Sequence, residues 1–273
     1  MSAQLSRLAD AAQPTEFHRL LHTLNDGQRL LRVYTQNIDQ LEEKVGLTYG
    51  IPDPHLLKPA KRGAPPKAER VARRQRELPT HDSIPRCIPL HGSIRFLVCQ
   101  VCRYTLPLRL YIDSLESGVR PPCPSCTEEE ETRRLDGKRP RGVGWLRPAI
   151  VLYNEHHQDD ETIGRLVQRD LSKRRNGYKS SPVDLLLVVG TSLHVSGTKQ
   201  IIRQFAGALH ASRTSSRQSD VDPPRTIYLN FDFHGSSKEW EGVFDVWIRG
   251  DAQVLAQLVH AGRVEAANAM LHQ

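Results

Sequence analysis

The sequence contains little that would point to a membrane-bound, secreted or disulfide-stabilised protein. Its 273 residues include only five cysteines, two methionines and 6% aromatic residues, and 38% of the chain is hydrophobic. No apolar run approaches the roughly 20 residues that a membrane-spanning helix needs. The first residues, Met1 to Gln13, lack the apolar segment of a signal peptide. We therefore expect an intracellular, mostly globular protein of one large or two smaller domains, with no membrane partner.

The positive charge of the chain is concentrated in one stretch. The formal net charge is +7, and between Lys58 and Arg86 nine lysines and arginines stand against three acidic residues. Several prolines lie at the start of this stretch. The composition predicts a basic, disordered insertion over residues 58–86. It could contact nucleic acid or chromatin, act as a nuclear import signal, or be a solvated loop, and the sequence leaves these three readings open.

Apolar periodicity in the rest of the chain predicts alternating strands and helices. The segment Val183 to Val189 is apolar without alternation, which is typical of a central parallel strand covered on both faces. The pattern predicts an α/β fold with a doubly wound parallel sheet. The first predicted helix begins near Thr15. The predicted helices are 15–25, 38–45, 161–171, 198–209 and 251–259, and the predicted strands are 30–34, 149–153, 183–189, 226–230 and 243–248.

A polar cluster follows the first predicted strand. Residues 34–39 read Tyr-Thr-Gln-Asn-Ile-Asp, and helical spacing resumes at Ile38. One interpretation is a capped turn, with Asn37 or Asp39 as the helix cap. The other is a ligand site, because open α/β sheets bind ligands at the carboxyl ends of their strands. The cluster alone does not decide between them.

Residues 95–147 differ in composition from the rest and predict a separate small module. Two C-x2-C pairs, Cys99 with Cys102 and Cys123 with Cys126, are separated by twenty residues. Four thiols at this spacing can bind one Zn²⁺ tetrahedrally. Disulfides or a thioredoxin-type redox pair are the competing interpretations, and an intracellular location disfavours disulfides. Four sulfur ligands leave no open position, so the predicted zinc is structural. Cys87 lies outside the pairs and is expected to be a small buried apolar residue.

Five motifs that carry polar, glycine or cysteine residues follow one another along the chain. They are Thr35-Gln36-Asn37-Ile38-Asp39, Leu90-His91-Gly92, the two cysteine pairs, Gly190-Thr191-Ser192-Leu193 and Tyr228-Leu229-Asn230. Together they resemble the sirtuin family of NAD-dependent protein-lysine deacylases. The likeness covers the chain from about Pro14 onward, and it is greatest to the fungal nuclear branch, whose members deacetylate a histone. The resemblance implies a nuclear protein, with the cytoplasm as the alternative, that takes part in chromatin silencing.

The resemblance assigns roles on the nicotinamide side of an NAD site. His91 would be the general base that draws a proton from the NAD ribose. Asn37, Asp39 and the backbone of Ile38 would bind nicotinamide, and Gln36 would contact its ribose. The acetyl group of the substrate lysine would pass to ADP-ribose with release of nicotinamide.

The resemblance also assigns the adenosine side and the substrate side. Gly190, Thr191 and Ser192 would contact a ribose, Asn230 the adenosine ribose, and Asp251 with Ala252 the adenine. The acetylated peptide would pair with the strand formed by Ile150, Val151, Leu152 and Tyr153. Residues 1–57 and 148–273 would form a Rossmann-like NAD-binding domain, with the zinc module as a second domain.

The sequence departs from the family pattern in three respects. Asn154 stands where Gly is usual, and Gln40 and Glu42 replace the usual Gly and His. The N-terminal strand and Gly-rich loop that hold the NAD pyrophosphate are not found, so the first strand-helix unit of the Rossmann-like domain is expected to be absent and NAD binding weak. An impaired sirtuin-like scaffold and an incomplete gene model of an active enzyme are therefore alternatives to an active deacetylase.

Overall fold

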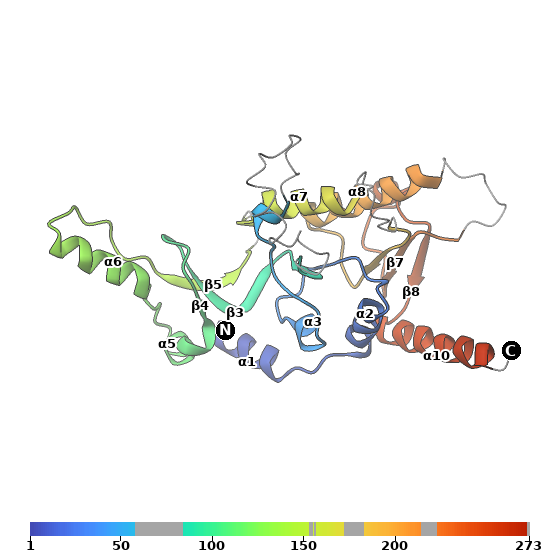
Figure 1. Cartoon of the computed structure of the whole chain (residues 1–273), viewed down its shortest axis with the longest axis horizontal. Coiled ribbons are helices and arrows are strands. Elements are labelled where there is room, and N and C mark those ends of the chain that lie inside the picture. The colour runs from blue at the N-terminus through green and yellow to red at the C-terminus, as the bar shows by residue number, and fades with distance from the viewer. Residues whose placement is uncertain (58–83, 153–154, 156, 172–182, 214–222, 272–273) are drawn as a thin grey trace, which may run out of the picture. The chain divides into compact units, whose positions relative to one another are not determined.

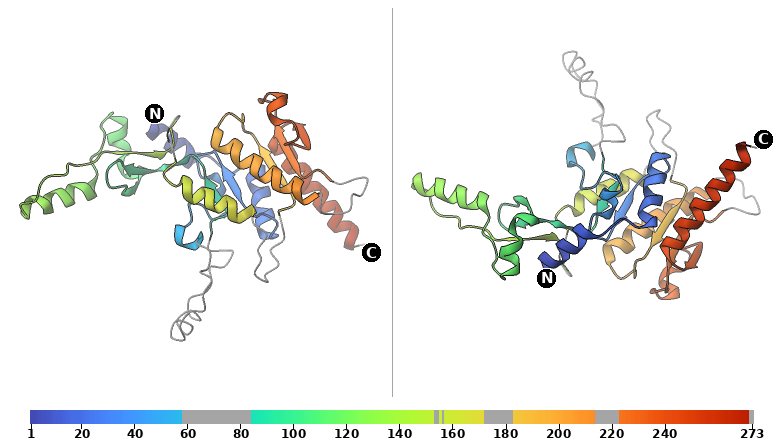
Figure 2. Two further views of the ribbon diagram at one scale, coloured as in Figure 1. Left: turned by 90° about the horizontal axis from the view of Figure 1, so that it is seen from above. Right: turned by 90° about the horizontal axis from the view of Figure 1, so that it is seen from below.

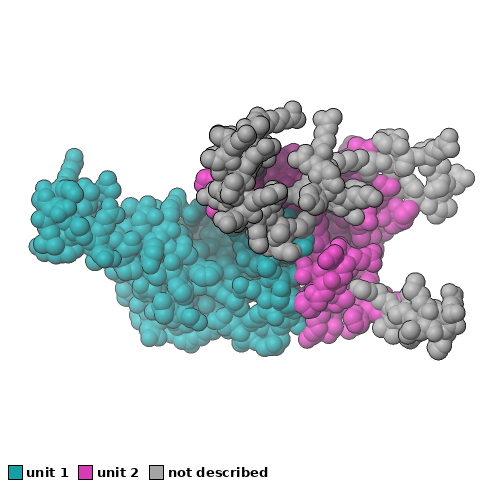
Figure 3. Space-filling view, in the orientation of Figure 1, with its two compact units in different colours: residues 1–14, 32–51, 85–160 teal, residues 15–31, 52–84, 161–273 magenta. Residues whose placement is uncertain are grey.

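The computed structural model describes residues 1–57, 84–152, 155, 157–171, 183–213 and 223–271 (Figure 1). The predicted basic insertion therefore lies outside the described residues, apart from its last three positions. The chain divides into two compact units (Figure 3). Unit 1 comprises residues 1–14, 32–51 and 85–160, and unit 2 comprises residues 15–31, 52–84 and 161–273. The predicted division into an NAD-binding domain and a zinc module stays a prediction.

Unit 1 contains two small sheets. Strand β1 (Val33–Thr35) pairs in parallel with β2 (Cys87–Pro89), so that Thr35 lies opposite Pro89. Strand β3 (Gly92–Cys99) pairs antiparallel with both β4 (Thr105–Pro107) and β5 (Leu146–Ile150), and its register with β5 shifts between Ser93 and Leu97. The path from β2 into β3 carries the chain from the first sheet to the second.

Helical segments of unit 1 pack against this second sheet. Helix α1 (Ser2–Ala11) packs against β3, the 3-10 helix η3 (Leu108–Tyr111) and α5 (Ile112–Glu116). The other two are α3 (Leu41–Lys44) and α6 (Pro124–Leu135). The core of this region combines the buried cysteines 99, 123 and 126 with Ala9, Ile94, Leu97, Leu108 and Leu146.

The presence of α1 corrects the expectation that the first helix begins near Thr15. Its buried face consists of Ala3, Ser6 and Ala9, whereas Leu5 and Leu8 are exposed. The usual stripe of large apolar residues, which identifies an amphipathic helix in a sequence, is therefore missing. Small residues at this face allow the helix to approach β3 closely.

Unit 2 is built on a parallel sheet of order β6 (Leu186–Val189), β7 (Thr226–Asn230) and β8 (Val246–Arg249). Its α-helices are α2 (Glu16–Asp26), α7 (Asp160–Leu171), α8 (Ser196–Arg213), α9 (Ser237–Trp240) and α10 (Ala252–Leu271), and η1 (Pro54–Leu57) is a 3-10 helix. Helices α7 and α8 lie side by side (Figure 2), and Gln168 Nε2 donates to Gln204 Oε1 at 3.2 Å. Helix α10 packs on α2, where the Phe17 N–H donates to Gln253 Oε1 at 2.9 Å.

An aromatic core lies beside the sheet of unit 2. Tyr228, fully buried on β7, stacks on Phe244 with the ring centroids 5.2 Å apart, and Phe244 stacks on Trp240 at 5.3 Å. Phe233 meets Tyr228 edge to face at 5.4 Å. Such aromatic pairs contribute beyond the area that they bury. This core fixes the end of β7 that carries Asn230.

The predicted fold class is confirmed as a mixed α/β fold with parallel sheets, and most predicted elements are found within a few residues. The main differences concern lengths. The helix predicted over 38–45 is only Leu41–Lys44, because Gln40 adopts a left-handed conformation with φ of 60° and Gly46 ends the turn with φ of 91°. The last helix runs well beyond its predicted end, to Leu271. Among the described residues no helix is long and apolar enough to cross a membrane.

Candidate functional site

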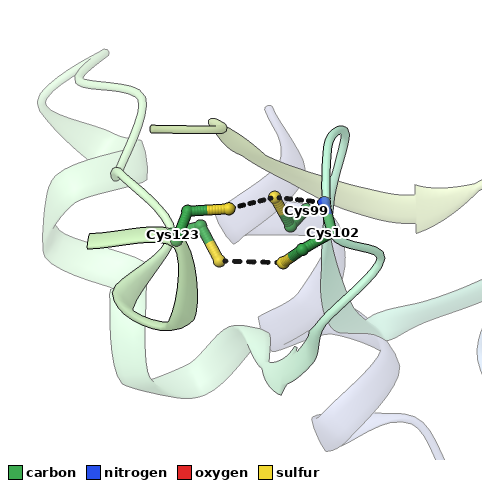
Figure 4. Close-up of side chains that lie close together, drawn as sticks. Cys99, Cys102 and Cys123 are labelled. Atoms are coloured by element: carbon green, nitrogen blue, oxygen red, sulfur yellow. Dashed lines mark hydrogen bonds between the residues drawn. The ribbon is translucent and has the colours of Figure 1, made fainter. Parts of the chain in front are cut away.

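The two cysteine pairs converge in unit 1 (Figure 4). Cys99 Sγ lies 3.7 Å from Cys126 Sγ, and Cys102 Sγ lies 3.6 Å from Cys123 Sγ. All four sulfur atoms lie within 4.8 Å of one another. With a Zn–S bond of about 2.3 Å, the edges of a tetrahedral site measure about 3.8 Å. The cluster thus fits one structural zinc ion, as the spacing predicted.

The backbone prepares this cluster for thiolates. The N–H groups of Val101 and Cys102 point at Cys99 Sγ, at 3.3 and 3.5 Å. Burial alone would raise the pKa of the Cys99 thiol, but these donors, together with the neighbouring thiols of Cys102 and Cys123, lower it to about 7. Burial raises the pKa of Cys123 to about 12 in the absence of metal. A cation is therefore needed to hold all four sulfurs as thiolates near neutral pH.

Gly144 completes the cluster, although the sequence analysis did not identify it. A Cβ atom at this position would lie 2.5 Å from Cys99 Sγ and 2.9 Å from Val101 Cβ. Its carbonyl accepts the N–H of Cys123 at 2.8 Å. The absence of a side chain at Gly144 therefore lets the segment before β5 lie in close contact with Cys99 Sγ. The motif spacing alone could not show this close approach.

The ring of His91 is held by the polar loop that follows β1. His91 Nδ1 lies 3.1 Å from the carbonyl oxygen of Gln36. Because a carbonyl only accepts, Nδ1 carries the proton, and in the neutral ring Nε2 is the unprotonated nitrogen. A histidine in this form can take a proton from a hydroxyl group. The structure thus brings His91 to the predicted cluster through the Gln36 backbone.

Hydrogen bonds that each involve a backbone group fix the predicted nicotinamide loop. The N–H of Asn37 donates to Thr35 Oγ1 at 3.2 Å, and the carbonyl of Ile38 accepts the N–H of Ile94 at 3.0 Å. Asp39 Oδ1 accepts the N–H of Leu41 at 3.3 Å. The N-cap residue of α3 is Gln40, which makes no side-chain cap bond, so Asp39 supports the start of the helix through an Asx-type bond without being its cap. This bond leaves the second carboxylate oxygen of Asp39 available to a ligand.

The predicted peptide-binding segment adjoins His91. The N–H of Val151 donates to the His91 carbonyl at 3.0 Å, and Ile150 lies opposite Gly92 in the register of β3 and β5. Gly92 has φ of +76°, and a Cβ atom there would lie 2.1 Å from the Ala149 carbonyl oxygen. Only glycine can therefore follow His91 here. Leu152 is 52% exposed, and Tyr153 lies outside the described residues.

His157 is a second histidine near this site, and the sequence analysis did not identify it. Its Nδ1 accepts the N–H of Asp159 at 3.0 Å, and its ring also bonds the backbone of Pro89, which can only accept. The two contacts fix the neutral ring with the proton on Nε2. Burial lowers the pKa of His157, against the opposing effect of Asp159 and Asp160, and His91 nearby lowers it further.

Unit 2 carries the other predicted residues at the carboxyl edge of its sheet. Gly190 leaves β6 with φ of +63°, and Ser192 is exposed in the following loop. The amide of Asn230 donates to the Thr191 carbonyl at 3.2 Å and to the Tyr228 hydroxyl at 2.8 Å. The two protons of the side-chain amide are used in these bonds, so Asn230 holds the loop after β6. Its side-chain carbonyl oxygen can still accept a hydrogen bond.

The remaining two predicted residues lie at the start of α10. Asp251 Oδ1 accepts the N–H of Gln253 at 2.8 Å and caps the helix, which begins at Ala252. The N–H of Gly250 donates to the backbone carbonyl of Asn230 at 3.3 Å. The ends of β6, β7 and β8 are thereby joined within unit 2, at the edge where parallel sheets bind ligands.

Comparison with known proteins decides the family. Residues 2–55 and 79–197 match the model of the Sir2 family. The chain belongs to the Sir2 family. The sirtuin resemblance carried by the motifs is thereby confirmed.

Fungal deacetylases are among the relatives of this sirtuin. It is 33% identical over 266 residues to the NAD-dependent histone deacetylase HST4 of Saccharomyces cerevisiae, covering 95% of this chain and 60% of that one. It is 34% identical over 255 residues to the NAD-dependent protein deacetylase hst4 of Schizosaccharomyces pombe, covering 93% and 50%. The chain thus spans less than two thirds of the length of these relatives. Their fungal origin agrees with the branch that the motifs predicted.

Solved Sir2 structures share the fold. A structure described as Sir2 bound to acetylated peptide matches with a TM-score of 0.55 and 17% identity, covering 92% of this chain and 71% of that one. Sir2Tm bound to a propionylated peptide matches with a TM-score of 0.54 and 18% identity, covering 95% and 78%. At these identities the likeness supports the fold class.

The cysteine cluster predicts one zinc ion per molecule and a strict need for glycine at position 144. Gly144→Ala should lower both the zinc content and the Tm, because its Cβ would displace Cys99 Sγ. Metal analysis and thermal denaturation would measure both. Gly164→Ala is the matched control, since a Cβ at Gly164 in α7 meets no atom within 4 Å. A wild-type chain without zinc, or a Gly144→Ala variant with full zinc and unchanged Tm, would contradict the assignment.

The lowered pKa of His157 predicts a pH-dependent contribution to stability. Below the ordinary histidine pKa of about 6.5, the unfolded chain takes up a proton that the folded chain does not, so the free energy of unfolding falls as the pH falls. In His157→Gln this part of the pH dependence should disappear. Denaturant midpoints between pH 5 and 8 would show a shallower decline for the variant than for the wild type. Parallel curves would show that His157 does not contribute.

Proposed function

We propose that this chain contains the catalytic core of an NAD-dependent protein-lysine deacetylase, transferring the acetyl group to ADP-ribose with release of nicotinamide. The observation that carries the proposal is the His91 ring, oriented by the Gln36 carbonyl at 3.1 Å so that Nε2 can accept a proton. Membership of the Sir2 family and the names of the fungal relatives support it.

The residues of unit 1 would perform the chemistry. NAD, when bound, would supply an electrophilic ribose carbon with nicotinamide as the leaving group. Asn37 and Asp39 would bind the nicotinamide amide, and His91 Nε2 would take the proton from a ribose hydroxyl. Gly92 would keep the base close to the substrate strand, because it allows the close contact with β5.

The residues of unit 2 would bind the rest of the cofactor. Gly190, Thr191 and Ser192 leave a parallel strand in a loop that opens α8, and Asn230 holds that loop. Asp251 and Ala252 at the start of α10 would border the adenine. On this proposal residues 1–57 and 148–273 form the NAD-binding domain, and residues 95–147 form a module whose zinc is structural.

The substrate would be an acetylated lysine in a protein, and a histone is the first candidate because relatives bear the name histone deacetylase. The peptide would pair as an added strand with Ile150, Val151, Leu152 and Tyr153. We place the protein in the nucleus on the same grounds. The basic residues 58–86 would add contacts to chromatin or nucleic acid, since their charge is strongly positive.

The proposal predicts that activity depends on His91. His91→Gln should lower the rate of NAD-dependent deacetylation of an acetylated histone peptide by about 100-fold or more, a typical contribution of a general base. Mass spectrometry of the peptide and of released nicotinamide would measure it. His260→Gln, which changes an exposed histidine on α10, is the matched control.

Two outcomes would contradict the proposal. Equal activity of the wild type and His91→Gln would remove His91 from the mechanism. A folded, zinc-containing wild-type chain with no activity, and with no binding of ADP-ribose by calorimetry, would support the alternative of a sirtuin-like scaffold.

A further inference from the structure

Lys44, at the end of α3, is bound to the end of another helix. Its ammonium group donates to the carbonyl oxygens of Ala9, Asp10 and Ala12 at 2.9, 2.8 and 2.7 Å. An ammonium group has three protons, so its donor capacity is fully used. Lys44 and these carbonyls all belong to unit 1.

These carbonyls need such a partner. The last four carbonyl groups of an α-helix have no partner within the helix and carry the negative end of its dipole. Helix α1 has no basic residue in its own last turn. Lys44 therefore supplies from α3 the cation that α1 lacks. Hydrogen bonds from a charged donor are stronger than neutral ones.

Two ion pairs of Arg95 also connect α1 with α3. Arg95 on β3 lies 3.2 Å from Glu43 of α3 and 3.6 Å from Asp10 of α1, measured between charged side-chain atoms. Glu43 and Asp10 are half exposed, so these pairs are worth less than the Lys44 contacts. Together the two contacts join three elements: α1, α3 and β3.

The other side of α1 rests on the cysteine core. Ala9, 6% exposed, belongs to the same buried cluster as Cys99, Cys123 and Cys126. Arg7 also pairs with Glu116 of α5 at 3.0 Å. Helix α1 therefore contacts this buried cysteine cluster, called the zinc core below, with one face. Its C-terminal end contacts Lys44.

Helix α3 begins where the predicted nicotinamide loop ends. Asp39 Oδ1 accepts the N–H of Leu41, and Gln40, 4% exposed, makes the left-handed bend between loop and helix. A single turn of helix separates this bend from Lys44. A short helix of this kind cannot hold its position by its own hydrogen bonds, so its orientation depends on tertiary contacts.

We propose that Lys44 is a positioning residue that fixes the loop Asn37–Asp39 by anchoring α3 to α1, and through α1 to the zinc core. The identity of this loop as the nicotinamide pocket rests on the proposed function. The mechanical connection does not. Loss of the ammonium group frees the end of α3, and the loop then samples orientations that do not bind the ligand.

Hydrogen exchange on the full zinc-bound chain tests the connection without activity. In Lys44→Met, the amides of residues 37–42 should exchange at least about tenfold faster, while amides of β7 in unit 2 keep their protection. Lys44→Arg retains the charge and should restore part of the protection. Lys138→Met is the matched control, because it removes an exposed lysine of the same unit that pairs with the neighbouring Asp136 at 2.8 Å. Zinc content should be unchanged in all three variants.

The proposal is overturned if residues 37–42 keep wild-type protection in Lys44→Met, or if all amides of unit 1 lose protection equally, which would indicate a general loss of stability. Should Lys44→Met fail to fold, Lys44→Arg decides, since it must loosen residues 37–42 selectively. In active protein, Lys44→Met should raise the KM for NAD about tenfold with a smaller change in kcat. If the chain has no activity and yet exchange changes as predicted, the proposed function fails and the positioning role of Lys44 stands.

Discussion

The convergence of four cysteine thiols in unit 1 is the interaction on which the rest of that unit depends. The buried cluster around them contains the large apolar side chains of Ile94, Leu97, Leu108 and Leu146, with partly buried apolar residues packed against it. Structural zinc sites bind with apparent free energies of about 10 to 16 kcal/mol, comparable with the whole stability of a typical domain. A zinc ion bound by the four thiolates would therefore add to this apolar core a contribution of the same order as the stability of a domain. Strands β3 and β5 and helices α1 and α6 are each held at this point.

The candidate chemistry follows from what these strands carry. His91 directly precedes β3, and its carbonyl accepts the N–H of Val151 just after β5, so the proposed base and the proposed peptide strand belong to one hydrogen-bonded sheet. The loop after β1 orients the imidazole through the Gln36 carbonyl. Unit 2 follows a different principle, in which the carboxyl ends of parallel strands are joined by Asn230 and by the cap at Asp251. Unit 1, which holds the cysteine cluster, thus carries the proposed reacting groups, and the parallel sheet of unit 2 carries the proposed cofactor contacts.

The residues that could be predicted from the sequence are those that belong to a motif of closely spaced residues. The cysteine pairs, the His91-Gly92 turn and the apolar strand before Gly190 belong to this class. Helix α1 could not be predicted in this way, because its buried face of Ala3, Ser6 and Ala9 lacks large apolar residues. The roles of Gly144, His157 and Lys44 could not be predicted either, because each residue acts through contacts with residues distant in the sequence. Asp39 admitted two interpretations because its carboxylate can bond the backbone at the start of α3, as it does at Leu41, and also lies in the predicted pocket.

On the proposed connection, the buried cluster around Cys99, Cys123 and Cys126 orders the loop that carries Asn37 and Asp39. Removal of zinc with a chelator, followed by hydrogen exchange resolved to single amides, tests it most directly. The account predicts that protection is lost together in β3, in α1 and at residues 37–42, while β6 and β7 in unit 2 stay protected, and that added zinc restores all three. Loss of protection around the cysteines alone, with residues 37–42 unchanged, would contradict it.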